Sequence, residues 1–457
     1  MVRWRWRGPG VQICVMPRSK NERGLTKSTS SLSRAAGQLA GHQAPGTIRR
    51  PWLGGLGLPY AMVYLGWPGG AVTLVLSWLI SLYTLHQLCD LHEFNGRRFN
   101  RYHELGVYAF GKVWGNIAVI TPQLIVMIGL GITYTVTGGQ SLKRFWAIVC
   151  HKGADGTCAT EFGLSAWIVV FTGVHLFLIQ CPNFNSLRPV SLLAAIMSMG
   201  YSTIAIGGSI KAGKQPGAEY NLNGYSTGAG ILNVFNALGI VAFAYGGHNV
   251  VLEIQSCMKS PKKTAANPQG LTYTPFMRGV YLAYTIVAWC YFGVSFTGYH
   301  SFGNHVEDNV LASIPGPKWM IAMADMFVVF HVIGSYQVYT MPVMDMIEVQ
   351  WVRRGHGINL ATRLVYRTIY VIIIAFIACT IPFFGSLMGF IGALGTGPTT
   401  FWLPSCIWLK LKKPPMTSWH FWASWVCIFL GVLVTIVGAI GGMRDIIVNA
   451  SGYHFYQ

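Results

Sequence analysis

Charged residues are scarce in this chain: they make up 10% of its 457 residues, whereas hydrophobic residues make up 52%. Soluble domains carry about 25% charged residues, so the composition excludes an ordinary water-soluble protein. Long polar stretches are also lacking. None exceeds about 50 residues, which leaves no room for a separate soluble catalytic domain. The sequence therefore predicts an all-α polytopic membrane protein.

Enzyme motifs are missing as well. The chain has no glycine-rich phosphate loop followed by lysine, no serine nucleophile elbow and no zinc-ligand spacing among its ten cysteines. Cys150 and Cys158 fall in one predicted loop, where their spacing allows either a disulfide in an oxidising compartment or two free thiols. We expect no enzyme, no metal site and no cofactor.

Apolar runs of roughly 18 or more residues are long enough to cross a bilayer as helices. Ten runs fit or nearly fit this length: 69–90, 114–139, 165–181, 187–207, 230–255, 278–299, 319–345, 364–382, 386–409 and 419–440. An eleventh run, 51–67, is shorter and contains several glycines and Pro59. The sequence thus predicts about eleven transmembrane segments, of which the first is truncated.

Basic residues are distributed unevenly over the predicted loops. With a cytosolic N-terminus, 26 of the 33 Lys and Arg fall on the inner side and 7 on the outer side. This asymmetry follows the positive-inside rule. The net charge of +19 therefore indicates membrane topology, with the bilayer as a partner, and not a nucleic-acid-binding surface.

Two predicted segments are interrupted at corresponding positions of a five-plus-five repeat, where inverted-repeat transporters bind their ligands. Gly55, Gly57 and Pro59 mark the start of a half-helix in segment one, whose free N–H groups would hold a carboxylate. In segment six, unwound carbonyls near Ala244, Tyr245 and Gly246 would accept from an α-ammonium. The pair fits a zwitterionic amino acid, although paired glycines also serve close helix packing.

Ionisable side chains at membrane depth are functional candidates. His248 adjoins the break in segment six, and Glu253 lies near the end of that segment. His331 shares one helix face with Ser335 and Tyr339 in segment eight. Because imidazole titrates near pH 6.5, we consider His248, Glu253 and His331 as proton-coupling residues. The alternative for each histidine is a buried ring that bonds a backbone carbonyl.

Several blocks of the chain resemble the plant amino acid/auxin permease family, and above all its lysine/histidine transporter branch. They are "LGLPYAM" at 56–62, "FNRYHELGVYAFG" at 99–111, "VTGGQSLKRF" at 136–145, "PNFNSL" at 182–187, "VAFAYGGHNVVLEIQ" at 241–255, "FGNHVEDNVLASI" at 302–314, "FVVFHVIGSYQVYTMPVMDMIE" at 327–348 and "GYHFY" at 452–456. The resemblance covers about 56–457.

This resemblance implies the inverted-repeat fold of the leucine transporter, with eleven spans. It also implies amino acid uptake at the plasma membrane driven by the proton gradient, with no cofactor. The substrate-binding residues that it implies are Gly57, Leu58 and Pro59 in segment one, Ala244, Tyr245, Gly246, Gly247 and His248 in segment six, and Gly334, Ser335 and Tyr336 in segment eight.

One part of the family pattern is replaced. Members of the family carry an apolar half-helix before "LGLPYAM", whereas this chain has Arg50, Pro51 and Trp52 there, after a basic stretch with a single acid, Glu22. The resemblance therefore implies that half of helix one is absent. A chain without it is expected to transport poorly or not at all, because the half-helix would supply acceptors for the α-ammonium.

The expected domains are a basic, disordered leader over 1–50, a transmembrane amino acid transporter domain over 51–445 and a short tail over 446–457. The leader is consistent with a misassigned gene start or with an organelle transit peptide. Two alternatives to a carrier stay open. One is a non-transporting relative that senses amino acids or modulates a full-length permease, and the other is a membrane enzyme that uses His248 and His331.

Overall fold

The computed structural model describes residues 53–150, 162–180, 188–222, 228–258, 272–355 and 357–451. The expected leader lies outside these ranges. Of the expected tail, residues 446–451 continue the last helix, and the rest lies outside the described residues.

The described chain is helical apart from one short hairpin, because backbone in a bilayer must satisfy its own hydrogen bonds. The elements of the first half are η1 (Leu53–Gly57), α2 (Leu58–Leu91), β1 (Glu93–Phe94), β2 (Arg97–Arg98), α3 (Tyr102–Phe110), α4 (Lys112–Val149), α5 (Leu164–Leu178) and α6 (Arg188–Ala212). Those of the second half are α7 (Gly228–Ala244), η3 (His248–Val250), α8 (Val251–Ser256), α9 (Tyr273–Phe302), η4 (Gly303–His305), α10 (Val310–Ser313), α11 (Lys318–Arg353), α12 (Leu360–Thr380), α13 (Phe384–Ile391), η5 (Gly392–Trp402), α14 (Leu403–Lys412) and α15 (Trp419–Ser451).

Eight helical stretches of the described chain are long and apolar enough to cross a membrane. One of them, Gly55–Leu91, contains the first two predicted segments. They meet at Gly66, whose φ of 67° and ψ of 178° break the helix just before Pro68. A residue with a Cβ rarely adopts a positive φ, so this glycine allows the chain to change direction between segments one and two.

Two other predicted segments have less regular counterparts. The run 165–181 corresponds to α5, which is shorter than the other spans. The run 386–409 is divided into α13, the π-helical η5 and α14. Each of the eleven predicted segments thus has a helical counterpart, and we number them one to eleven in chain order.

At four of the five corresponding positions, helices of the two halves pack against each other. Segments one and two in α2 contact α7 and α9, which belong to segments six and seven. Segment three (α4) packs along segment eight (α11), and segment four (α5) packs against segment nine (α12). Such pairing is the arrangement expected of a five-plus-five repeat.

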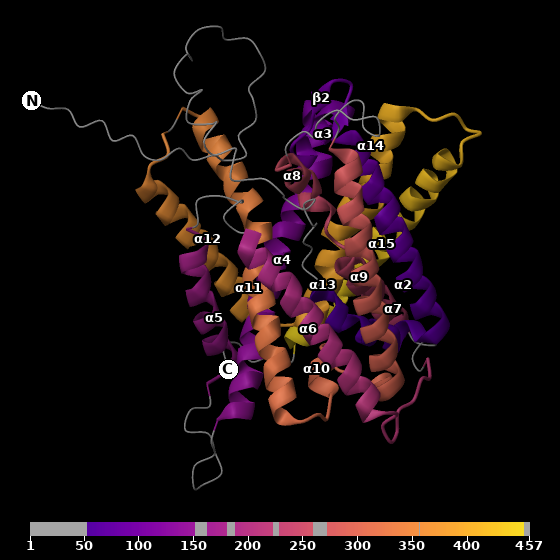
Figure 1. Cartoon of the computed structure of the whole chain (residues 1–457), viewed down its shortest axis with the longest axis vertical. Coiled ribbons are helices and arrows are strands. Elements are labelled where there is room, and N and C mark those ends of the chain that lie inside the picture. The colour runs from indigo at the N-terminus through magenta and orange to yellow at the C-terminus, as the bar shows by residue number, and fades with distance from the viewer. Residues whose placement is uncertain are drawn as a thin grey trace, which may run out of the picture.

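The bundle has two distinct ends (Figure 1). The hairpin of β1 and β2, together with α3 and α14, covers one end, which we call the α3 end. The short helix α10 lies at the opposite end, which we call the α10 end. Large apolar side chains such as Phe177, Phe376 and Phe429 are exposed on the outer helices, as expected for a surface that faces lipid.

Candidate functional site

The interruption in segment one leaves a helix N-terminus inside the bundle. The tight turn η1 ends at Gly57, and α2 begins with Leu58 and Pro59. Gly55 and these three residues are all buried, and no side chain caps the helix start. The first N–H groups of a helix have no partner within the helix, and its dipole is positive there. This geometry suits a carboxylate.

Close packing explains the glycines at this turn. A Cβ on Gly57 would lie 2.3 Å from the terminal methyl of Met388 in α13 and 3.5 Å from the carbonyl oxygen of Asp308. Asp308 belongs to the loop before α10, where burial raises the pKa of its carboxyl. Segment one therefore begins against both segment ten and the loop of the α10 end.

The interruption in segment six exposes backbone carbonyls that side chains of other helices satisfy. The α-helix α7 ends at Ala244, and helical structure resumes at His248. The carbonyl of Ala244 accepts from the Tyr291 hydroxyl at 2.8 Å, and that of Tyr245 accepts from the Ser81 hydroxyl at 3.4 Å. Because membrane-embedded backbone must find partners within the protein, these contacts stabilise the break.

Segment three also contributes to this break. The side-chain amide of Gln123 in α4 donates to the carbonyl of Asn249 at 2.8 Å. Its nitrogen also lies 3.5 Å from Oε1 of Glu253 in α8. Glu253 is therefore oriented toward α4.

His248 is turned toward segment two. Its Nε2 lies 3.1 Å from both the hydroxyl of Thr84 and the carbonyl of Ser81, and its side chain is fully buried. The ring therefore ties the break in segment six to α2.

The candidate residues of segment eight face α5 and α6 rather than the two breaks. Gly334 is packed against α6, where a Cβ would lie 2.9 Å from that of Ala194. His331 bonds the carbonyl of Ala194 through Nδ1 at 2.9 Å, and its Nε2 lies 3.4 Å from the hydroxyl of Ser335. Tyr336 stacks on His175 of α5 with ring centroids 3.9 Å apart. The structure thus brings the segment-one and segment-six candidates together and places those of segment eight around α5 and α6.

Segment ten contributes a third interruption, which the sequence reasoning missed. The stretch Gly392–Trp402 forms the π-helix η5, and such irregular turns are frequent at functional sites. Gly246 lies so close to it that a Cβ would be 2.8 Å from Cγ2 of Thr396. The run of glycines before Pro398 was the signal that could have revealed this break.

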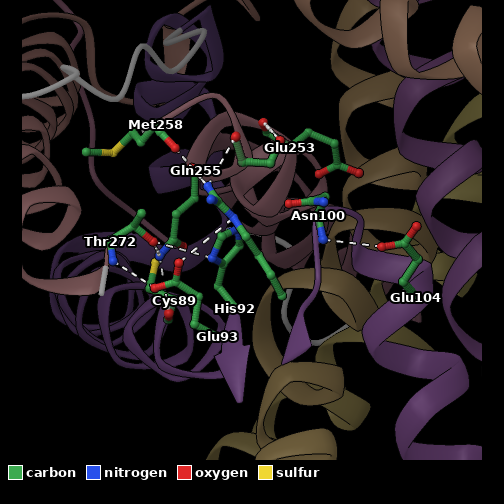
Figure 2. Close-up of polar contacts among 11 residues, drawn as sticks. Cys89, His92, Glu93, Asn100, Glu104, Glu253, Gln255, Met258 and Thr272 are labelled. Carbon is green, nitrogen blue, oxygen red and sulfur yellow. Dashed lines mark hydrogen bonds and ion pairs between the residues drawn. The ribbon is translucent and has the colours of Figure 1, made fainter. Parts of the chain in front are cut away.

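The α3 end is closed by a polar cluster around the end of α8 (Figure 2). One guanidinium nitrogen of Arg98 donates to the carbonyls of Gln255, Ser256 and Met258 at 3.4, 3.2 and 2.8 Å. Glu93 of the same hairpin accepts from the N–H of Thr272, just before α9, at 2.7 Å. The hairpin therefore holds segments two, six and seven together.

A second set of contacts at this end joins α3 to other segments. Arg101 pairs with Asp345 of α11, and the hydroxyl of Tyr102 donates to the carbonyl of Thr399 in η5 at 3.1 Å. Burial lowers the pKa of His103 to about 4, helped by Arg101 and Arg353. The stretch 97–111 is unusually rich in Tyr, His, Glu and Arg, but the sequence did not indicate which segments it would contact.

A disulfide between Cys150 and Cys158, one of the two alternatives for these cysteines, is not tested by the structure. Cys150 follows α4 and is disulfide-bonded. Cys158 lies outside the described residues.

Comparison with known proteins agrees with this geometry. Residues 53–444 match the model of a family described as transmembrane amino acid transporter protein. The chain belongs to this transmembrane amino acid transporter family. It is therefore a transporter-family protein and not an enzyme, which confirms the resemblance inferred from the sequence.

Named relatives in this family come from Arabidopsis thaliana. Lysine histidine transporter-like 1 is 46% identical over 406 residues, covering 88% of this chain and 87% of the relative. GABA transporter 1 is 28% identical, covering 88% and 89%. Among solved structures, MhsT in complex with L-phenylalanine matches with a TM-score of 0.51 and 10% identity over 87% of this chain and 96% of that one. This likeness concerns the fold alone and confirms the predicted leucine-transporter-like architecture.

Proposed function

We propose that the chain carries amino acids across the plasma membrane together with protons. The observation that carries this proposal is the meeting of two interrupted segments in the interior, where η1 packs against α7. The N-terminus of α2 offers N–H groups to a carboxylate, and the C-terminus of α7 offers carbonyls to an ammonium. A zwitterion with both groups on one carbon fits between such ends.

The carbonyl oxygens at the end of α7 can accept only a few more hydrogen bonds, and this limits where an ammonium group can bind. The oxygens of Ala244 and Tyr245 already accept one hydrogen bond each from Tyr291 and Ser81. A carbonyl oxygen has two lone pairs, so each retains one acceptor site. These oxygens and that of Gly246 form our proposed ammonium site.

The proposed orientation places the α3 end in the cytosol. Basic side chains gather there, among them Arg97, Arg98, Arg101, Lys410, Lys412 and Lys413. Cytosolic loops of membrane proteins are enriched in Lys and Arg. In this orientation the polar clusters around Arg98 and Arg101 close the cytosolic exit, while the loop of Asp308 faces outward.

Glu253 is our preferred proton carrier among the three candidates. His248 is bound to α2 and His331 to α6 through the contacts described above. Glu253 is a carboxylate in the short half-helix α8, next to both the break and the capping helix α3. Proton binding there would remove a charge between the ligand site and the cytosolic cap, which gives a chemical basis for coupling.

Uptake of labelled amino acids by cells that express the chain tests this function. We expect faster uptake at pH 5.5 than at pH 7.5 and loss of the difference after a protonophore is added. The Glu253→Gln variant should lose the acid stimulation, whereas Glu307→Gln, at an exposed position near the α10 end, should keep it. Uptake that is absent for every amino acid in both the chain and a version with a family-like half-helix restored, or that is insensitive to the proton gradient, would refute the proposal.

The same assay tests the expectation about helix one. A version with a family-like half-helix before Leu56 should transport faster than the chain as it stands. Equal uptake rates in the two versions would show that binding of the α-ammonium group does not depend on that half-helix.

A further inference from the structure

Tyr291 of α9 contacts both interrupted segments at once. Its hydroxyl donates to the carbonyl of Ala244 at 2.8 Å, where α7 ends. Its ring lies against Gly55 in η1, so closely that a Cβ there would be 2.9 Å from Cδ1 and Cε1. The ring also meets that of Tyr245 edge-on, with centroids 5.4 Å apart. With 2% of its surface exposed, Tyr291 belongs entirely to the interior.

We infer that Tyr291 is a positioning residue that sets the distance between the breaks of segments one and six. The inference deepens the proposed function and rests on it, because these breaks are the proposed ends of the amino acid site.

The hydroxyl acts on the end of segment six. Ala244 is the last residue of α7, and the final carbonyls of a helix have no partner within the helix. Inside a membrane protein such a carbonyl needs another donor. Without the hydroxyl of Tyr291, the end of α7 would shift toward a different partner.

The ring acts on segment one by a separate contact. Gly55 leaves room for the ring, since a Cβ at this position would lie 2.9 Å from two of the ring carbons. A methyl group at position 55 would push against this ring. The two contacts are made by different parts of one side chain, which lets them be altered independently.

The chain offers a matched control on the same helix. Tyr281 of α9 is 51% exposed on the outside of the bundle. Tyr281→Phe removes a hydroxyl from the same helix as Tyr291→Phe does, but from an exposed position ten residues away along α9.

Hydrogen exchange of the purified full chain in lipid nanodiscs measures the positioning directly. In Tyr291→Phe, the backbone N–H groups of Tyr245–Asn249 and of Gly55–Leu58 should exchange faster than in the parent, and Tyr281→Phe should match the parent. Equal exchange in Tyr291→Phe and the parent would overturn the inference.

Uptake kinetics measure the consequence for the ligand. Because a displaced end weakens binding of the amino acid, Tyr291→Phe should raise KM by about tenfold with little change in the maximal rate, as for the loss of one buried hydrogen bond. Gly55→Ala should raise KM as well, and the double variant should show less than the product of the two increases, because both changes act on the distance between the same two breaks.

The outcomes separate the two proposals. A lower maximal rate with unchanged KM in Tyr291→Phe would overturn the positioning role. Absence of amino acid uptake by both the parent chain and the version with a restored half-helix would overturn the proposed function, and the exchange comparison alone would then decide whether Tyr291 holds the two breaks.

Discussion

At the scale of single residues, side chains complete the hydrogen bonding that broken helices leave open. Arg98 is the clearest case at the α3 end, since one of its nitrogens contacts three carbonyls at the end of α8. A guanidinium presents several donors in a rigid, planar group and stays charged at any physiological pH. It therefore suits the C-terminus of a helix, where the dipole is negative.

Replacing Arg98 by methionine should loosen α8. The variant keeps an apolar side chain of similar length but leaves the three carbonyls without this donor, which costs about 1–3 kcal/mol. Faster hydrogen exchange over Val251–Met258 and a lower melting temperature should follow. The control is Arg97→Met, because Arg97 is exposed on the same hairpin. Identical results for the two variants would contradict the role assigned to Arg98.

His103 should make the stability of the protein sensitive to acid. Its pKa is lowered from 6.5 to about 4, first by burial and then by Arg101 and Arg353. Between pH 6.5 and about pH 4 the unfolded chain binds a proton at this position and the folded chain does not, so stability falls as the pH falls through this range.

The test for His103 is a comparison of melting temperatures from pH 7 to pH 4.5. Glu104 acts in the opposite direction, because burial raises the pKa of its carboxyl, so the comparison must be made between variants. His103→Gln should lose less stability on acidification than the parent. His305→Gln, at an exposed position, should behave like the parent. An unchanged slope in His103→Gln would contradict the prediction.

The sequence showed where segments one and six are interrupted, but not which side chains contact these interruptions. Glycine and proline act on the local backbone, so Gly55–Pro59 and Gly246–Gly247 could be recognised in isolation. Tyr291 and Ser81 could not, because their contacts with the break in segment six join residues 47 and 164 positions apart. The position of a tyrosine or serine within an apolar span does not indicate which backbone carbonyl its hydroxyl will bond.

At the scale of elements, segments six, ten and eleven pack through glycines. A Cβ on Gly239 of α7 would lie 2.2 Å from the carbonyl oxygen of Gly389 in α13. A Cβ on Gly442 of α15 would lie 2.6 Å from the backbone nitrogen of Phe390. Small residues let membrane helices approach closely enough for backbone to touch backbone.

Gly239→Ala should therefore destabilise the protein strongly. The added methyl group meets a backbone atom of α13, which cannot rotate away as a flexible side chain would, so the cost should reach about 1–3 kcal/mol or more. Gly207→Ala is the control, because a Cβ on this glycine of α6 meets nothing within 4 Å. Thermal unfolding in detergent measures the stability of both variants. Equal melting temperatures would show that segments six and ten can move apart without loss of stability.

Hydrophobicity predicted the spans well, but it did not predict the irregular element. The run 386–409 reads as one apolar segment, yet it contains the π-helix η5. Hydropathy indicates whether a residue prefers lipid, but it does not indicate the hydrogen-bonding pattern within a helix. The glycines and Pro398 in this run weaken regular α-helical bonding, and this could have been weighed as it was for segments one and six.

At the scale of the whole molecule, the two repeats are related through pairs of segments that touch. Segment one contacts six, two contacts seven, three contacts eight and four contacts nine. The proposed site lies in the first of these pairs, while the contacts of Arg101 and Tyr102 at the α3 end reach segments eight and ten. Opening of that end must therefore break contacts that join the α3 end to segments eight and ten, as movement of one part of the bundle against another requires.

Proton movement coupled to amino acid entry is the most direct test of this account. The purified chain is placed in liposomes that contain a pH-sensitive dye, with no initial pH gradient and with the membrane potential negative inside. Addition of an amino acid that the chain carries should acidify the interior, and Glu253→Gln should abolish the signal. Entry of labelled amino acid without any acidification would contradict the account.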